Sequence, residues 1–290
     1  MSLDAILLTA HGTIENLDDL PEFLARVRHG RPAPPELVAE LRRRYSAIGG
    51  SPHLRITREQ ARLLARELGL PVFVGMRLFR PELGDALREA HSAGVTRLVV
   101  LPLAPFSVHV YAAAAERARS ELGLPLSLVP AQPFGQSQEF VSAQAELIRP
   151  LLAERAPCEL LLTAHSLPSK VVQAGDPYAE QVEESARAIG ALLGRGYDLV
   201  YQSQGADGGD WLGPDLRTAL RSVQARGRKQ VVVAPVGFVS DHVETLYDLD
   251  IEAKAWAGEL GLEFTRVPSL NTAAPLISAL AAVARRALLS

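Results

Sequence analysis

An internal repeat constrains the fold of this chain more than any other feature. The five residues Leu7-Leu-Thr-Ala-His11 recur letter for letter at residues 161–165. A longer stretch, residues 98–110, aligns with residues 231–243 and follows the first match in the same order. Half of the 290 residues is close to the usual domain size of about 150. The chain is therefore interpreted as one structural unit duplicated, with the two copies facing each other across a cleft.

Short apolar runs alternate with segments of helical period along both halves. This alternation is typical of a parallel sheet covered by helices, because strands buried on both faces are almost continuously apolar. We expect an α/β fold in which each half holds a four-stranded parallel sheet flanked by helices. The strands are expected near 5–9, 72–75, 98–101, 126–129, 159–163, 198–202, 231–234 and 263–266, and helices over 35–48, 57–68, 139–154, 177–193 and 214–226.

Four of the seven histidines follow symmetry-related strands of the two halves: His11, His165, His109 and His242. In open α/β sheets the ligand crevice lies beyond the carboxyl ends of the strands. A histidine in such a loop can equally serve as a hydrogen-bonded structural residue. We interpret His165 and His11 as candidates for function, and His109 and His242 as structural.

Acidic residues recur every fourth position after the last of these histidines, at Glu244, Asp248 and Glu252. On an α-helix this spacing gives one ridge about 12 Å long, and Ser240 or Asp241 is expected to cap that helix. Carboxylate and imidazole groups suit divalent metals, so the ridge predicts a path for a cation. The alternative is an exposed acidic helix face.

Composition excludes several classes of function. Thirty Lys and Arg against 33 Asp and Glu leave no basic excess, which argues against a nucleic-acid partner. Cys158 is the sole cysteine, so the chain cannot supply the four thiolates of an iron–sulfur cluster, and a reducing cytoplasm is expected. The glycine-rich stretch 205–213 lacks the lysine of a phosphate-binding loop, and we expect no organic cofactor.

Seven short motifs are spread along nearly the whole chain: Arg44-Tyr-Ser-Ala-Ile-Gly-Gly-Ser-Pro52, Gly75-Met-Arg-Leu-Phe-Arg-Pro81, Ala164-His-Ser-Leu-Pro168, Gly175-Asp-Pro-Tyr178, Tyr201-Gln-Ser203, Trp211-Leu-Gly-Pro-Asp215 and the block 236–248. They resemble the motifs of the ferrochelatases, which insert ferrous iron into a porphyrin. The resemblance implies two Rossmann-like domains, 1–134 and 135–271, with a final helix over 272–290 that could pack back on the first. It also implies a cytoplasmic monomer with at most peripheral membrane contact, whose partners are a porphyrin and Fe²⁺ as substrate.

The resemblance also implies roles for individual residues. His165 would bind metal and accept pyrrole protons, with Glu244 as its partner, and Asp248 and Glu252 would relay metal or protons. The residues expected to contact the porphyrin are Arg28, Arg31, Ser51, Tyr201 and Trp211. A histidine suits this role because removing pyrrole protons requires a base of near-neutral pKa.

One local feature points to a different tetrapyrrole. His11 lies in an Ala-His-Gly sequence that is similar to the catalytic histidine of the small sirohydrochlorin chelatases. We therefore expect His11 to be catalytic as well, facing His165. Two alternatives to a porphyrin ferrochelatase remain open: a sirohydrochlorin-type cobalt or iron chelatase, and a non-catalytic tetrapyrrole-binding relative.

Overall fold

The computed structural model describes residues 3–155, 157–205 and 209–289, and its contacts divide the chain into two compact units. Unit 1 comprises Met1–Pro133 with Thr272–Ser290, and unit 2 comprises Phe134–Asn271. Each unit contains one four-stranded sheet with every strand parallel, which confirms the predicted fold class.

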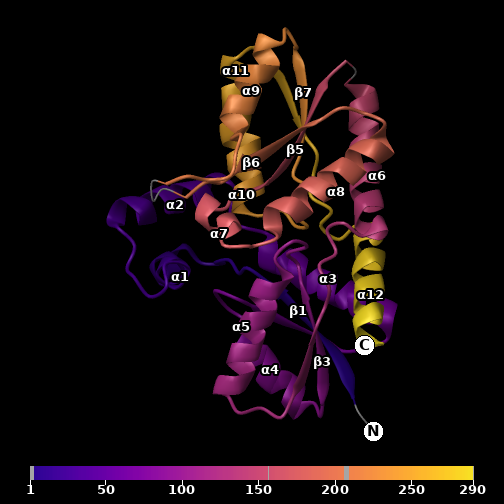
Figure 1. Cartoon of the computed structure of the whole chain (residues 1–290). Helices are drawn as coiled ribbons and strands as arrows, with labels where there is room; N and C mark the ends of the chain where they lie inside the picture. Colours follow the sequence, from indigo (N-terminus) through magenta and orange to yellow (C-terminus); the bar gives the residue numbers. More distant parts are fainter. Residues whose placement is uncertain (1–2, 156, 206–208, 290) are drawn as a thin grey trace. The chain divides into compact units, whose positions relative to one another are not determined.

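The strands of unit 1 lie in the order β2-β1-β3-β4. Helices α4 and α5 cover one face of this sheet, and α3 and α12 cover the other (Figure 1). The strands are β1 (Asp4–Ala10), β2 (Val72–Met76), β3 (Arg97–Pro102) and β4 (Ser127–Pro130). The helices are η1 (Leu17–Asp19), α1 (Leu20–Val27), α2 (Pro35–Ala47), α3 (His53–Leu68), α4 (Leu83–Ser92), α5 (Val108–Glu121) and α12 (Ala274–Leu288).

The strands of unit 2 repeat this order as β6-β5-β7-β8. Helices α6 and α8 pack on one face, and α9 and α11 pack on the other. The strands are β5 (Glu159–His165), β6 (Asp198–Gln202), β7 (Gln230–Ala234) and β8 (Glu263–Arg266). The helices are α6 (Gln138–Glu154), α7 (Ser169–Gln173), α8 (Tyr178–Leu193), α9 (Leu216–Ala225), α10 (Val243–Leu246), the π-helix η2 (Asp248–Ala253) and α11 (Lys254–Glu259).

Small details of the two units also correspond. After the second strand of each unit the chain loops back, so that Met76 N–H donates to the carbonyl of Pro81 at 2.7 Å and Tyr201 N–H donates to that of Pro214 at 2.9 Å. In each case the next helix begins two residues later, at Leu83 or Leu216. Such agreement in backbone pairing supports duplication more strongly than a short sequence identity does.

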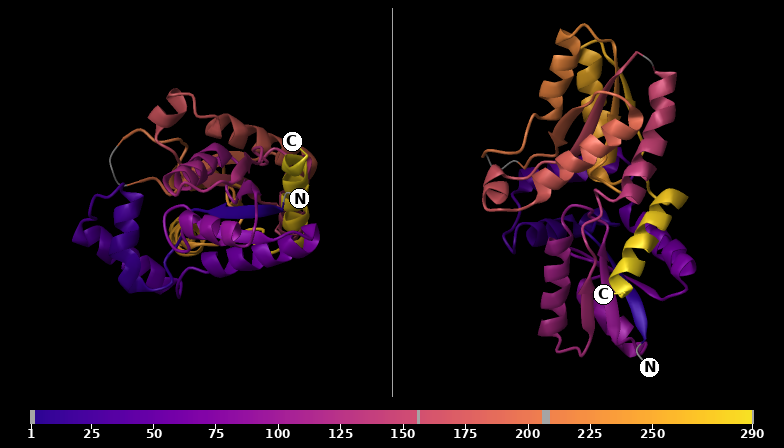
Figure 2. Two further views of the ribbon diagram at one scale, coloured as in Figure 1. Left: turned by 90° about the horizontal axis from the view of Figure 1, so that it is seen from below. Right: turned by 45° about the vertical axis from the view of Figure 1, so that its right-hand side comes forward.

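Helix α12 belongs to unit 1 although it follows unit 2 in the sequence. It packs against α3 and β3, and Figure 2 shows it in yellow alongside the indigo and purple elements of unit 1. The side chains of Leu276 and Leu280 are fully buried. Among the described residues, no helix is long and apolar enough to cross a membrane.

Candidate active site

The predicted residues of unit 2 gather at the carboxyl ends of its strands. His165 is the last residue of β5, and Gln202 lies beside it as the last residue of β6. After β7 the chain runs through residues 235–242 and begins α10, which carries Glu244. Because parallel strands end at one edge of the sheet, three separate segments meet there.

Two imidazole rings face one oxygen of the Glu244 carboxylate. The Nε2 of His165 lies 3.6 Å from Glu244 Oε2, and the Nε2 of His242 lies 3.5 Å from the same oxygen. The Nδ1–H of His165 donates to the carbonyl of Ser166 at 2.5 Å, and that of His242 donates to the carbonyl of Ser240 at 3.1 Å. A carbonyl can only accept, so both rings carry a proton on Nδ1 and turn Nε2 toward the carboxylate.

This arrangement shifts the pKa values of His165 and Glu244 so that the charged form of each is favoured. Burial alone would lower the pKa of His165, but the Glu244 carboxylate outweighs burial and raises that pKa above its usual value. Burial alone would raise the pKa of Glu244, but the two imidazoles hold it well below its usual range. Since 35% of the His165 side chain and 30% of the Glu244 side chain are exposed, water screens the pair in part.

Hydrogen bonds from buried side chains hold the backbones of both residues. The Tyr178 hydroxyl donates to the carbonyl of His165 at 2.8 Å. The Gln202 amide donates to the carbonyl of Glu244 at 2.9 Å and accepts from the Thr163 hydroxyl at 2.7 Å. Gln202 thus connects the strand that carries His165 to the helix that carries Glu244.

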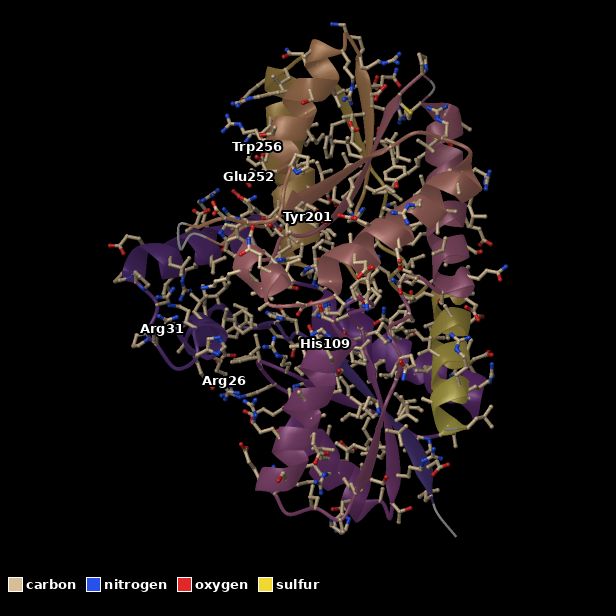
Figure 3. The ribbon with its side chains drawn as sticks, viewed as in Figure 1. Arg26, Arg31, His109, Tyr201, Glu252 and Trp256 are labelled. Carbon is tan, nitrogen blue, oxygen red and sulfur yellow. The ribbon has the colours of Figure 1, made fainter. Side chains whose placement is uncertain are left out.

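The acidic ridge takes a different form from the one expected. Asp248 and Glu252 lie on the π-helix η2, in which the amide of Glu252 donates to the carbonyl of Tyr247 five residues back at 3.0 Å. A π-helix turn contains more residues than an α-helix turn, so acids spaced four residues apart do not line up in the straight ridge that an α-helix would give. Asp248 is 9% exposed and accepts from the Ser203 hydroxyl at 2.5 Å, whereas Glu252 is half-buried (Figure 3).

The cap of α10 also differs from the expected one. The cap residue is His242, whose amide donates to the Thr245 hydroxyl at 3.0 Å, and not Ser240 or Asp241. Asp241 instead accepts from the Thr245 hydroxyl at 3.1 Å and from the Arg266 guanidinium at 2.8 Å. His242 was expected to be structural, and the one sequence feature that singled it out was its alignment with His109 in the repeat.

The remaining predicted residues are divided between the two units. Tyr201 is 4% exposed within unit 2, and burial raises the pKa of its hydroxyl to about 12. The indole of Trp211 packs against Gly205 so closely that a Cβ there would lie 2.7 Å from the ring. The residues in unit 1 are Arg28 at the end of α1, the exposed Arg31, the half-buried Ser51, and His11 directly after β1 (Figure 3 labels Arg31).

Few potential metal ligands gather at this site. Within residues 3–155, 157–205 and 209–289, no three His, Cys, Asp or Glu side chains are grouped so that they could hold a metal ion together. His165 and Glu244 supply one nitrogen and one carboxylate that a divalent cation could share.

A family model and several known proteins are similar to this chain along nearly its whole length. A model of the ferrochelatase family matches residues 3–288. A ferrochelatase of Acidobacterium capsulatum is 37% identical over 307 residues, covering 98% of this chain and 94% of the relative. A coproporphyrin III ferrochelatase of Geobacillus kaustophilus is 37% identical over 297 residues, covering 96% and 94%.

Solved structures share the fold at low identity. The structure described as SirB from Bacillus subtilis with Fe3+ has a TM-score of 0.62 and 13% identity, covering 98% of this chain and 95% of that one. CbiX, described as the terminal enzyme for biosynthesis of siroheme in denitrifying bacteria, has a TM-score of 0.55 and 14% identity, covering 97% and 98%.

Proposed function

Because this chain belongs to the ferrochelatase family, we propose that it inserts Fe²⁺ into a porphyrin in heme biosynthesis, with His165 and Glu244 at the centre of the reaction. The observation that carries this proposal is the pair itself, with Nε2 of His165 lying 3.6 Å from Oε2 of Glu244 at the end of β5. A base and a carboxylate in contact meet both needs of the reaction, which are removal of protons and neutralisation of an incoming cation.

This pair can accept the two protons that metal insertion releases from the porphyrin. Two pyrrole N–H bonds break and the two protons leave. The bound Fe²⁺ cancels the two negative charges left on the ring nitrogens, while the propionates keep their own charges. His165 takes each proton on Nε2, because Nδ1 is held by the Ser166 carbonyl. Glu244 stabilises the imidazolium that forms, and the proton passes to solvent before the second transfer.

A two-ligand site suits a metal that is substrate. A cation bound by a full set of protein ligands would be held too tightly for transfer, whereas one imidazole and one carboxylate leave coordination positions for the porphyrin nitrogens. We propose that Asp248 and Glu252 on η2 attract the cation and pass it toward Glu244. His11, in unit 1, is proposed as a further base or metal ligand.

We propose coproporphyrin III as the porphyrin. Several curated relatives at 34–37% identity are named coproporphyrin III ferrochelatases. This substrate carries four propionates, and guanidinium groups such as those of Arg28 and Arg31 bind carboxylates well. Ser51 could add a hydroxyl donor, with Trp211 and Tyr201 contacting or supporting the ring.

One assay tests this proposal against its alternatives. Fe²⁺ is supplied anaerobically with coproporphyrin III, protoporphyrin IX or sirohydrochlorin, and the Soret band is followed. We expect metallation of coproporphyrin III to be fastest. Faster metallation of sirohydrochlorin would instead support the second candidate, which the Ala-His-Gly sequence at His11 favours. Binding of a porphyrin without metallation would overturn the proposal.

A further inference from the structure

Arg266, the last residue of strand β8, ties together the two segments on either side of Glu244. Its side chain is only 12% exposed. One edge of the guanidinium donates to both oxygens of Asp250, from Nε at 2.6 Å and from Nη2 at 2.9 Å. Its Nη1 donates to Asp241 Oδ1 at 2.8 Å and to the carbonyl of Val267 at 3.4 Å. Asp241 precedes α10 and Asp250 lies in η2. The Arg266 guanidinium therefore connects the N-terminal end of α10 to η2.

Asp241 is fixed by more than Arg266. Its other carboxylate oxygen accepts from the Asn271 amide at 2.7 Å, while its own backbone amide donates to the Asn271 side-chain oxygen at 2.8 Å. The Thr245 hydroxyl donates to Asp241 as well, and Thr245 is the residue after Glu244. Any movement of Asp241 therefore moves the turn of helix that carries Glu244.

The elements that carry the acidic residues have little stability of their own. Helix α10 has four residues, far fewer than an isolated helix needs. The π-helix η2 has the rarer hydrogen-bond pattern, and Asp250 is two residues from both Asp248 and Glu252. Arg266 therefore binds η2 through Asp250, a residue that has no role in the proposed reaction. The positions of α10 and η2 therefore depend on their contacts with other elements of unit 2.

Resting on the proposed function, we infer that Arg266 is a positioning residue that sets the distance between Glu244 and His165 by clamping Asp241 and Asp250. The planar guanidinium can bond two carboxylates at once in a fixed geometry, whereas the single ammonium of a lysine cannot reproduce three such bonds. Buried partners that orient a reacting group typically contribute about 10- to 100-fold to activity or metal affinity.

The matched control is Arg226, which also bridges two carboxylates in unit 2. It donates to Glu159 at 3.2 Å and to Asp198 at 2.6 Å, and these begin β5 and β6 at the edge of the sheet opposite His165. We compare Arg266→Gln, Arg266→Lys and Arg226→Gln by Fe²⁺ insertion into coproporphyrin III. The measurements are kcat, KM for Fe²⁺, porphyrin affinity by fluorescence quenching, and amide hydrogen exchange in α10 and η2.

For Arg266→Gln we expect kcat to fall about 10- to 100-fold with faster amide exchange in α10 and η2, and porphyrin affinity to stay close to wild type. Arg266→Lys should recover only a small part of the loss. Arg226→Gln should keep kcat within about twofold, because it removes a more exposed pair far from the site. An Arg266→Gln protein with the kcat and exchange rates of Arg226→Gln would overturn the inference.

A second variant covers the case in which Arg266→Gln does not fold. Asp250→Asn weakens the bond to η2 and leaves the Arg266–Asp241 contact in place, and it too should lower kcat and speed exchange in η2. Wild-type kcat and exchange in Asp250→Asn would contradict the clamp. If the wild-type protein itself metallates no porphyrin, the proposed function fails, and the exchange rates still decide whether Arg266 orders α10 and η2.

Discussion

Two imidazole rings lie next to one carboxylate oxygen of Glu244. This contact raises the pKa of His165 and lowers the pKa of Glu244. The raised pKa of His165 means that its contribution to stability is complete below the usual value near 6.5 and is lost as pH rises through the folded-state value. The lowered pKa of Glu244 makes its contribution complete above about 4.5 and lost at lower pH. The pair therefore stabilises unit 2 most between these two values, with His165 protonated.

The raised pKa of His165 predicts the pH dependence of the reaction. A base must be neutral to accept a proton, so kcat/KM should rise with pH through an apparent pKa above 6.5. Glu244→Gln should slow the reaction and move this rise to lower pH, because the carboxylate that raises the His165 pKa is gone. The measurement is the pH–rate profile, paired with an NMR titration of His165. A wild-type rise centred below 6.5 would contradict it.

Removing the imidazole should separate metallation from porphyrin binding. We expect His165→Ala to lose at least about 100-fold in metallation rate, a typical contribution of a positioned base, and to bind porphyrin normally. The assays are the Soret shift and fluorescence quenching. The control is His91→Ala, which changes an exposed histidine in the last turn of α4. Wild-type turnover by His165→Ala would refute the assignment.

At the residue scale the sequence predicted that His165 and Glu244 are partners, and their side chains do lie 3.6 Å apart, but it did not predict what surrounds them. His165 and Glu244 were identifiable from a repeat, an acid pattern and a family resemblance. The role of His242 depends on which way its ring points, and that is set by the Ser240 carbonyl and by the unexpected cap of α10. Gln202 lies in the motif Tyr201-Gln-Ser203, but no role was predicted for it, since that role comes from one hydrogen bond with Thr163 and one with Glu244.

The π-helix η2 predicts unequal contributions from its two acids. Asp248 is nearly buried and helps to raise the pKa of His165, whereas Glu252 is more exposed and more fully screened. We expect Asp248→Asn to raise KM for Fe²⁺ more than Glu252→Gln does, each with a modest change in kcat. Initial rates at varied Fe²⁺ test this. Ser203→Ala, which removes the donor to Asp248, is the companion variant, and equal KM values for Asp248→Asn and wild type would exclude the relay.

Helix α9 offers a test of local stability away from the reaction. Asp215 caps it, accepting from the Thr218 amide at 2.9 Å and from the Thr218 hydroxyl at 2.8 Å. Asp215→Ala should lower the free energy of unfolding by about 0.5–2 kcal/mol. Burial alone would raise the pKa of Asp215 but the Thr218 bonds lower it, so this contribution should fade as pH falls below about 4. Denaturant unfolding at pH 7 and pH 3 measures both effects, and an unchanged unfolding midpoint would contradict them.

The regular elements were largely predictable, and the irregular ones were not. All eight strands occur within two residues of their expected ends, because continuous apolar runs bounded by polar turns leave few alternatives. Helix α3 begins at His53 and not near Thr57, and its first turn buries Leu54 and Ile56 together with His53. The π-helix was missed because its sequence repeats acids at an α-helical interval.

Helix α12 links the stability of unit 1 to a segment beyond unit 2. Leu280 is fully buried there, and Leu280→Ala should cost about 2–5 kcal/mol of unfolding free energy. The loss should show as faster amide exchange in α3 and β3, with β5 and β6 protected as before. Leu289→Ala, at a position 89% exposed, is the control. Equal loss of protection in both units would contradict this assignment.

The path of the chain also bears on the order in which the molecule is made. The ribosome releases the four strands of unit 1 first, but α12, which shares one face of their sheet with α3, is synthesised after the whole of unit 2. Unit 2 is contiguous and can fold as soon as it emerges. Unit 1 therefore lacks one of the two helices on that face until synthesis ends, whereas all elements of unit 2 have been made before α12.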